Sequence, residues 1–282
     1  MINTMKTAFL MSLLVALAIL IGYALGGMTG LIIGGAIALV GNLFSYWFSD
    51  KIVLATYRAQ ELSEEEAPKL HAMVERLTQR AGLPKPRVYL VPSQTPNAFA
   101  TGRSPKHAVI AVTEGCVRTL RDQELEGVLA HEISHVADRD MLIATIAATM
   151  AGAIMMVASM MRWGMMMGGM GGRNQRGPNP LVLLAIAIFA PIAAMLIQLA
   201  ISRSREYEAD AQGARLAGSA DSLADALETL ESASRRSRLE AAGPATAHLF
   251  IVNPLSAKGL ASLFSTHPPI EERVRRLRSM TI

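Results

Sequence analysis

The sequence has little charge, few aromatic residues and a single cysteine. Of its 282 residues, 18% are charged, 5% are aromatic and 51% are hydrophobic, and the mean hydropathy is +0.31. So high a hydropathy with so few charges argues against a simple soluble globular protein and favours the membrane class. The lone thiol, Cys116, cannot form an internal disulfide. We therefore expect a small buried residue and no need for an oxidising compartment.

The net charge of the chain is modest and positive, with a formal value of +4 and an isoelectric point of about 9.4. In a membrane protein, excess Lys and Arg usually lie in cytoplasmic loops and contact anionic headgroups. The chain has no signature of an RNA- or DNA-binding motif, so we expect no nucleic-acid partner.

Four long segments contain no Asp, Glu, Lys or Arg, and each has about the 20 residues that a helix needs to cross a bilayer. They cover approximately residues 7–26, 28–48, 141–161 and 181–201. The first is longer than the apolar part of a signal peptide and the second follows at once, so we expect a retained helix. Only Gly26 and Gly27 join the two, which predicts a tight hairpin.

With four spans, the N-terminus and both polar parts of the chain lie on one side of the membrane. The polar parts hold nearly all Lys and Arg, which predicts that this side is the cytoplasm. The Met cluster from Met155 to Met170, at the end of the third segment and in the loop after it, is expected to be adaptable apolar packing rather than a soft-metal site. The predicted parts are a transmembrane hairpin (1–48), a polar part (49–140), a second transmembrane hairpin with a Gly/Met-rich loop (141–201) and a second polar part (202–282).

The polar parts contain patterns of both strands and helices. The runs RVYLVP (87–92) and HAVIAVTEG (107–115) predict strands, joined by a turn-rich connection at 93–106. A capping-box pattern predicts a helix that begins at Ser63 and ends at Gly82. Further helices are predicted after a cap at Asp122 and at 202–218, 221–238 and 270–280. The predicted fold class is therefore a mainly α membrane protein with a cytoplasmic α+β domain.

The stretch AHEISHVADRD (130–140) contains the pattern H-E-x-x-H. Residues i and i+4 of a helix share one face, so His131 and His135 can bind one zinc ion together. Glu132 is then beside the open coordination position, where it can take a proton from bound water. The neighbouring residues are uncharged, as expected around a packed site. The alternative is two ordinary histidines on an amphipathic helix.

A catalytic zinc ion needs a third protein ligand. Asp138 and Met141 stand where a metzincin would continue with Gly and His, which excludes that class. The stretch SREYEAD offers carboxylates on a second helix, where Glu206 and Asp210 share one face and Glu208 points elsewhere. We predict Glu206 as the third ligand and Asp210 as the group that orients a ligand histidine. The alternative is a solvated charged face.

The distances along the chain support this pairing. At 1.5 Å per residue, His135 and His131 lie ~9 and ~15 Å before the third apolar segment, and Glu206 lies ~8 Å after the fourth. These two segments would form an antiparallel hairpin. The three groups are therefore expected at similar heights, side by side.

Together these motifs resemble the HtpX family of bacterial membrane zinc metalloproteases, relatives of the CAAX prenyl endopeptidases. The resemblance rests on LAHEISHVADRD, SRSREYEADAQGARLAG and HLFIVNPLSAKGLASLFSTHPPIEERVRRL, and it extends over essentially the whole chain. It implies an inner-membrane endopeptidase with a zincin-like (gluzincin) domain and a cytoplasmic site. That site would hold one Zn²⁺ at His131, His135 and Glu206, with Glu132 as the base. It also implies the lipid bilayer, misfolded or damaged membrane-protein substrates and other quality-control proteases as partners.

Two further regions have candidate roles. The resemblance favours His267, in FSTHPP, as a donor to the oxyanion, whereas a His before Pro-Pro is by itself more often a loop residue. Asn97, Ala98, Phe99 and Ala100 are candidates for a sheet edge that binds substrate as an added strand. Ordinary turn chemistry of the sequence TPNA is the equal alternative.

Two other functions stay open at this point. A catalytically silent membrane scaffold would keep zinc for stability alone. A small transporter would usually need an ionisable residue within a span, and the four segments contain no Asp, Glu, Lys or Arg.

Overall fold

The computed structural model describes residues 2–142, 203–236, 251 and 268–282. Apart from Met141 and Leu142, the third and fourth apolar segments lie outside the described residues. The Gly/Met-rich loop between them and His267 also lie outside.

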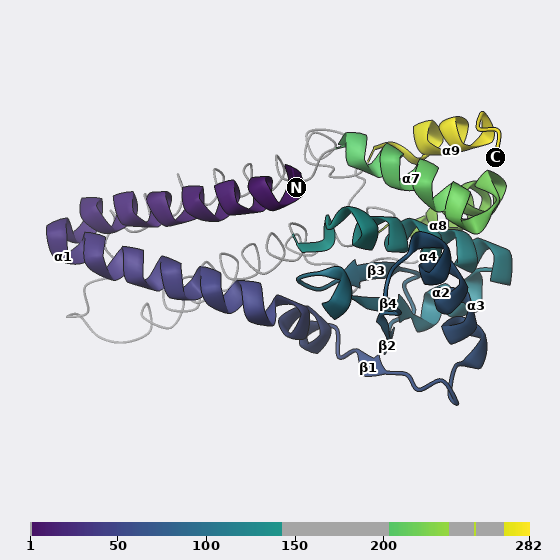
Figure 1. The fold of residues 1–282 in the computed structure, drawn as a ribbon, viewed down its shortest axis with the longest axis horizontal. Coiled ribbons are helices and arrows are strands. Elements are labelled where there is room, and N and C mark those ends of the chain that lie inside the picture. The colour runs from purple at the N-terminus through teal and green to yellow at the C-terminus, as the bar shows by residue number, and fades with distance from the viewer. Residues whose placement is uncertain (1, 143–202, 237–250, 252–267) are drawn as a thin grey trace.

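Helix α1 (Ile2–Thr56) folds back on itself as a hairpin, as the sequence predicts (Figure 1). The turn lies at Gly26 and Gly27, and Gly27 has φ 57° and ψ −140°, which residues with a Cβ rarely adopt. The two arms meet at Gly22 and Gly30, where a Cβ on Gly22 would lie 2.1 Å from the carbonyl oxygen of Gly30. Glycine is thus required both at the turn and where the arms touch.

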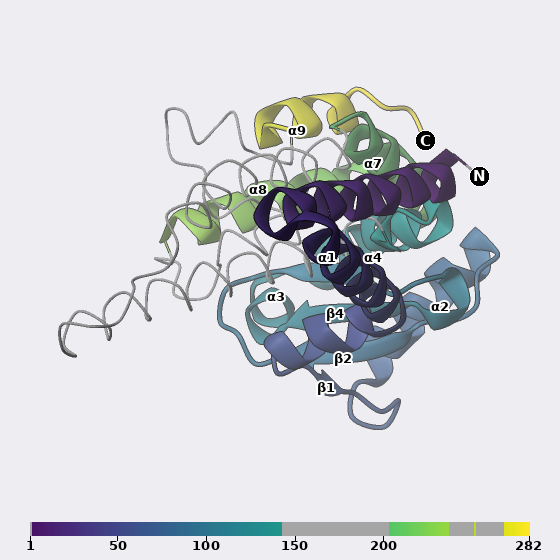
Figure 2. The same ribbon diagram turned by 90° about the vertical axis from the view of Figure 1, so that its left-hand side faces the viewer.

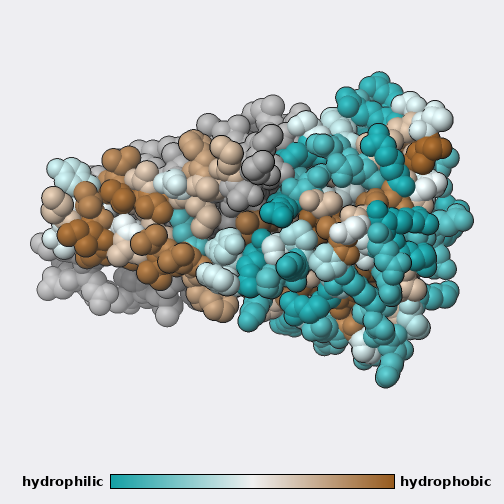
Figure 3. Space-filling view, viewed as in Figure 1, coloured by the Kyte–Doolittle hydropathy of each residue, from teal (hydrophilic) through white to brown (hydrophobic). Residues whose placement is uncertain are grey.

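Among the described residues, Gly26–Phe48 is the helix that is long and apolar enough to cross a membrane, with a mean hydropathy of 1.7. Only 6% of its apolar window is buried inside the protein, and side chains such as Ile37 and Val40 are about two-thirds exposed. Figure 3 shows this apolar surface on the hairpin beside the hydrophilic surface of the rest. The polar Asn42 donates to the carbonyl of Met11 at 3.0 Å. The hairpin therefore has the surface expected for membrane association.

A four-stranded sheet has the strand order β1-β2-β4-β3. Strands β2 and β4 are parallel, and β1 and β3 pair antiparallel at the two edges. The strands are β1 (Gln60–Glu61), β2 (Arg87–Val91), β3 (Ala98–Thr101) and β4 (Val109–Thr113). The predictions of β2 and β4 are confirmed. The turn-rich connection predicted at 93–106 contains β3, whose four buried residues pair with β4. Of the two alternatives for residues 97–100, the structure agrees with a sheet edge and not with a turn.

Six further helices lie in the described residues, and the sequence predicts all but the short α3. They are α2 (Pro68–Ala81), α3 (Glu114–Thr119), α4 (Asp122–Asp138), α7 (Arg203–Ala217), α8 (Ala220–Arg236) and α9 (Ile270–Arg278). Helix α2 begins at Pro68 because Ser63 and Glu66 exchange hydrogen bonds of 2.8 and 3.2 Å in a separate turn before it. Gly82, with φ 64°, ends α2 as predicted. Helix α4 is capped one residue earlier than predicted, at Arg121.

The two faces of the sheet are covered by different parts of the chain. Helices α2 and α4 pack on one face, in the core cluster that includes Ile110. On the other face, Val53 and Leu54 at the end of α1 pack against Phe99. Helix α1 therefore continues past residue 48, where the sequence analysis places the end of the hairpin, and connects the hairpin directly to the sheet.

Helix α4 is the central helix of the polar region. Figure 2 shows α7, α8 and α9 on one side of it and the sheet on the other. Two glycines allow the close packing. A Cβ on Gly127 would lie 2.8 Å from the nitrogen of Leu223 in α8, and a Cβ on Gly213 in α7 would lie 2.8 Å from that of His131. The helix that contains H-E-x-x-H is thus held between two layers.

Candidate metal centre

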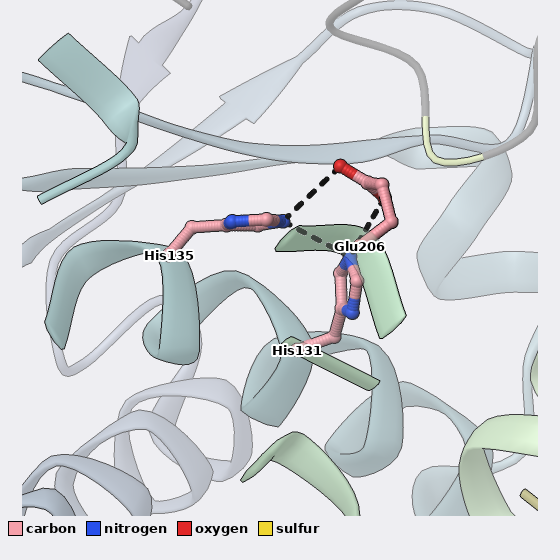
Figure 4. Close-up of side chains that lie close together, drawn as sticks. All are labelled: His131, His135 and Glu206. Carbon is pink, nitrogen blue, oxygen red and sulfur yellow. Dashed lines mark hydrogen bonds and ion pairs between the residues drawn. The ribbon is translucent and has the colours of Figure 1, made fainter. Parts of the chain in front are cut away.

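Three side chains from two helices converge near the C-terminal end of α4 (Figure 4). The Nε2 atoms of His131 and His135 lie 3.3 Å apart. In the first turn of α7, Glu206 places Oε2 3.8 Å from Nε2 of His131 and Oε1 3.7 Å from Nε2 of His135. Glu208 is exposed and Glu206 is buried. The structure therefore brings together the three side chains that the sequence analysis proposes as ligands.

The spacing of these atoms fits a tetrahedral metal ion. Zinc bonds to nitrogen and oxygen are about 2.0–2.2 Å long, which separates two ligand atoms of a tetrahedron by about 3.3–3.6 Å. The separations of 3.3, 3.7 and 3.8 Å agree with this to within a few tenths of an ångström. Two imidazoles and one carboxylate are also a common ligand set of catalytic zinc, in which a fourth position stays open.

A buried Asp–Arg pair supports His131 from behind. Oδ1 of Asp210 lies 3.1 Å from Nδ1 of His131, and Arg273 of α9 binds both oxygens of Asp210 at 2.7 and 2.8 Å. Burial alone would raise the pKa of Asp210, but the charge and hydrogen bonds of Arg273 outweigh it and lower this pKa to about 2. The ionised Asp210 favours a proton on Nδ1, so that Nε2 of His131 can act as the ligand atom.

His135 has a similar but looser support. Oδ2 of Asp140 lies 3.6 Å from Nδ1 of His135, and Arg205 of α7 donates to Asp140 at 2.9 Å. Burial alone would lower the pKa of His135, but the nearby carboxylates of Asp140, Glu206 and Glu132 raise it to about 9. This shift favours a proton on His135 in the metal-free protein. Cation binding would displace this proton, because a ligand histidine is neutral.

Glu132 lies beside the three ligand side chains and is anchored to the sheet. Its Oε2 accepts a hydrogen bond of 2.8 Å from the N–H of Ala100 in β3. Its side chain is buried, and this burial raises its pKa above the ordinary range, against the lowering effect of His131 and His135. A carboxylate whose pKa is moved toward neutrality is suited to accept and return a proton.

The predicted substrate residues lie at the edge of the sheet nearest Glu132. Ala98, Phe99 and Ala100 belong to the edge strand β3, and Asn97 directly precedes it. The carbonyl of Asn97 accepts from the N–H of Thr113, the last residue of β4, so the alternation along a strand turns the N–H and C=O of Ala98 and Ala100 away from β4. The bond from Ala100 to Glu132 agrees with this geometry.

The sequence analysis does not identify Arg273, Asp140 or Arg205. Arg273 stands 63 positions from Asp210 in a helix with several other arginines, so its spacing gives no signal. Asp140 and Arg205 lie inside the two motif stretches. Their charges stand so close to the proposed ligands in the sequence that a role beside the site could have been predicted. The proposed oxyanion donor His267 lies outside the described residues.

Comparison with known proteins decides the family. The model of "Peptidase family M48" matches residues 64–281, which is most of the chain. The chain belongs to peptidase family M48.

This M48 peptidase is similar to proteins named "Protease HtpX homolog" over nearly its whole length. The relative from Syntrophobacter fumaroxidans is 58% identical, with 98% of each chain covered. The relative from Pyrococcus furiosus is 55% identical, with 98% of this chain and 96% of the relative covered. These matches confirm the resemblance to the HtpX family, and with the family match they identify the protein as a metalloprotease.

The M48 peptidase is also similar to the crystal structure of S. mikatae Ste24p, with a TM-score of 0.55 and 20% identity. The match covers 98% of this chain, and the chain spans 64% of the length of that structure. At this identity the likeness concerns the fold alone. It confirms the mixed helix and sheet architecture.

Proposed function

We propose that this M48 metalloprotease is a zinc endopeptidase that hydrolyses misfolded or damaged membrane proteins, in quality control and the stress response. The observation on which the proposal rests is the cluster of His131, His135 and Glu206, whose ligand atoms lie within 4.8 Å of one another. The buried Glu132 lies beside them. Membership of a peptidase family supports peptide-bond hydrolysis at this cluster.

The proposed cofactor is one Zn²⁺ per chain, with His131, His135 and Glu206 as ligands. When bound, zinc polarises the scissile carbonyl and makes a coordinated water molecule more acidic. The ligand set and the separations of 3.3, 3.7 and 3.8 Å support zinc over cations that prefer oxygen ligands. Asp210 orients His131 through its contact with Nδ1.

Proton transfer is assigned to Glu132. It takes a proton from the attacking water and returns it to the leaving amine, which a carboxylate of raised pKa can do. Its bond from the Ala100 N–H holds one carboxylate oxygen in place. His267 is proposed as a donor to the oxyanion, and this assignment rests on the family resemblance of FSTHPP.

Substrate is proposed to bind along β3 as an added strand. Asn97, Ala98, Phe99 and Ala100 are the residues concerned. The support is the edge position of β3 and the outward direction of the backbone groups of Ala98 and Ala100. A peptide bonded to this edge would run past Glu132.

The proposed location is the bacterial inner membrane, with four spans and with both termini and the site in the cytoplasm. The parts are the hairpin 1–48, the polar part 49–140, the second hairpin 141–201 and the polar part 202–282. Support comes from the apolar surface of the α1 hairpin and the concentration of Lys and Arg in the polar parts. The proposed partners are the lipid bilayer, membrane-protein substrates and other quality-control proteases, without nucleic acid.

The test compares the wild type with Glu132→Gln, both purified in detergent, for zinc content and for cleavage of an unfolded protein. We expect one zinc per chain in both and a loss of cleavage of at least about 100-fold in the variant. Normal cleavage by Glu132→Gln would exclude the base role. A zinc-loaded wild type without any cleavage would favour a silent, zinc-stabilised membrane scaffold.

The choice of the third ligand is tested by a matched pair of variants. Glu206→Gln should lose zinc, whereas Glu208→Gln, which changes an exposed carboxylate two residues away, should retain it. Loss of zinc in Glu208→Gln with retention in Glu206→Gln would show that Glu208, and not Glu206, is the third ligand.

A further inference from the structure

His135 has an aspartate and an arginine behind it, arranged as they are behind the other ligand histidine. Oδ2 of Asp140 faces Nδ1 of His135 at 3.6 Å. Oδ1 of the same carboxylate accepts from Nη1 of Arg205 at 2.9 Å. Asp140 is 8% exposed, so the carboxylate meets these partners with little competition from water.

A strained turn holds Asp140 in this position. Arg139 ends α4 with φ 60°, in the left-handed region that is sterically costly for a residue with a Cβ. The turn reverses the chain, so that the N–H of Asp140 donates to the carbonyl of His135 at 3.0 Å. It also returns the Asp140 side chain to the ring of the same histidine. Strain of this kind is kept where the resulting geometry has a use.

The charged side chains around the centre favour a divalent cation. Two arginines, Arg205 and Arg273, lie among four buried carboxylates, so the sum is −2 when the histidines are neutral. The four carboxylates are Glu132, Asp140, Glu206 and Asp210. One divalent cation brings the sum to zero. Arg205 is therefore needed in this balance, because without it Asp140 would add an uncompensated charge beside the site.

We propose that Asp140, held by Arg205, is a positioning residue for His135 that sets the zinc affinity of the centre. This inference rests on the proposed zinc function. The carboxylate favours the proton on Nδ1 and turns Nε2 of His135 toward Glu206. Arg205 directly precedes Glu206 in α7, so the contact also ties the ligand-bearing end of α4 to the ligand-bearing turn of α7.

The position of the pair in the chain gives it a second consequence. Asp140 directly precedes the apolar segment 141–161, and Arg205 follows the segment 181–201 by only a few residues. The contact between Asp140 and Arg205 therefore joins the residue before the proposed second hairpin to a residue shortly after it. Because Asp140 contacts His135, the distance between these two ends of the proposed hairpin would also affect the orientation of His135.

The test measures the zinc dissociation constant of full-length variants in detergent, by competition with a chromogenic chelator. Asp140→Asn should weaken zinc binding by about 10- to 100-fold, as loss of a carboxylate behind a ligand histidine typically does. Arg205→Gln should weaken it less, and the double variant should match Asp140→Asn, because Arg205 acts through Asp140. The metal-free variants should still fold, with a melting temperature that is lowered less than by Asp210→Asn.

Asp138→Asn is the matched control, since it removes a less buried carboxylate two residues away. Its zinc affinity should stay within about twofold of the wild type. Arg205→Lys keeps the positive charge, so its zinc affinity should lie closer to that of the wild type than that of Arg205→Gln does. It is the more conservative variant and is expected to fold. Equal effects of Asp138→Asn and Asp140→Asn, or wild-type affinity in Asp140→Asn, would overturn the positioning role. A wild type that binds no zinc would overturn the proposed function itself.

Discussion

The two candidate ligand histidines lie in different surroundings. His131 is 1% exposed, has Asp210 at 3.1 Å and is backed by Arg273, which is fully buried. His135 is 16% exposed and has Asp140 at 3.6 Å. Arg273 makes two hydrogen bonds with Asp210, whereas Arg205 makes one with Asp140, so breaking the deeper pair should cost more. We infer that the deep end, around His131, contributes more to the stability of the fold than the rim, around His135, and that both ends position the proposed metal ligands.

Arg273→Gln should have the largest effect, because it leaves the Asp210 charge buried without its main partner. We expect the free energy of unfolding of the metal-free protein to fall by about 3–5 kcal/mol. Denaturation in detergent measures this. Arg275→Gln on the same helix is the control, since Arg275 is 76% exposed and its ion pair should contribute less than about 1 kcal/mol. Similar losses in both variants would remove the distinction between a deep and an exposed charge.

Gly213→Ala tests whether the close contact between α4 and α7 is needed for the geometry around His131. The added Cβ would lie 2.8 Å from the backbone nitrogen of His131, so the helices must separate. We expect a loss of about 1–3 kcal/mol in stability, together with weaker zinc binding. Gly41→Ala provides the comparison, because its Cβ would meet nothing within 4 Å. If both variants bind zinc as the wild type does, the close contact has no part in the site.

Asp210→Asn compares the deep aspartate with Asp140 at the rim. Zinc affinity should fall by about 10- to 100-fold. Asp210→Asn should also lower the melting temperature of the metal-free protein, and by more than Asp140→Asn does, because Arg273 then loses its main charged partner and keeps only the 4.0 Å contact with Glu206. Thermal denaturation with and without zinc separates the two effects. An unchanged melting temperature for Asp210→Asn, with a lowered one for Asp140→Asn, would reverse the comparison.

The smallest effect concerns Cys116, a fully buried residue of the core. The reactivity of its thiol measures how well the core excludes solvent and reagents. Burial, with a further contribution from Glu132, raises the pKa of its thiol to about 12. The thiol is therefore neutral at pH 8 and should react slowly with a thiol reagent, and the rate should rise as the pH approaches 12. The unfolded protein, with an ordinary thiol pKa of about 8.5, is the control and should react fast at pH 8. Rapid labelling of the native protein at pH 8 would show an open core.

Local patterns predict much of the fold and most of the ligand cluster. The hairpin follows from two uncharged segments joined by Gly26 and Gly27. The shared face of His131 and His135 follows from helical periodicity. The choice of Glu206 over Glu208 also follows from that periodicity, and the geometry agrees with it. Each of these depends on residues within a few positions of one another, which a sequence displays directly.

Strand β3 shows where local patterns fail. Its four residues, AFAT, stand between turn formers and lack a β-branched run, so nothing local favours a strand. They form one because β4 offers a free edge to which they can pair. The start of α2 is a similar case, since the capping-box bonds of Ser63 and Glu66 form in a turn that Pro68 separates from the helix.

The sequence by itself determined the chemistry of this protein: an apolar hairpin, an H-E-x-x-H helix and a second helix with a carboxylate at the matching height. Only the tertiary structure decided how that chemistry is supported. Arg273 reaches Asp210 across 63 positions, and Arg205 reaches Asp140 across 65. Contacts between distant segments depend on how helices pack around α4, and the packing of Gly213 against His131 has no local signature. The candidate ligand residues are therefore visible in the sequence, whereas the orientation of their side chains appears only in the folded chain.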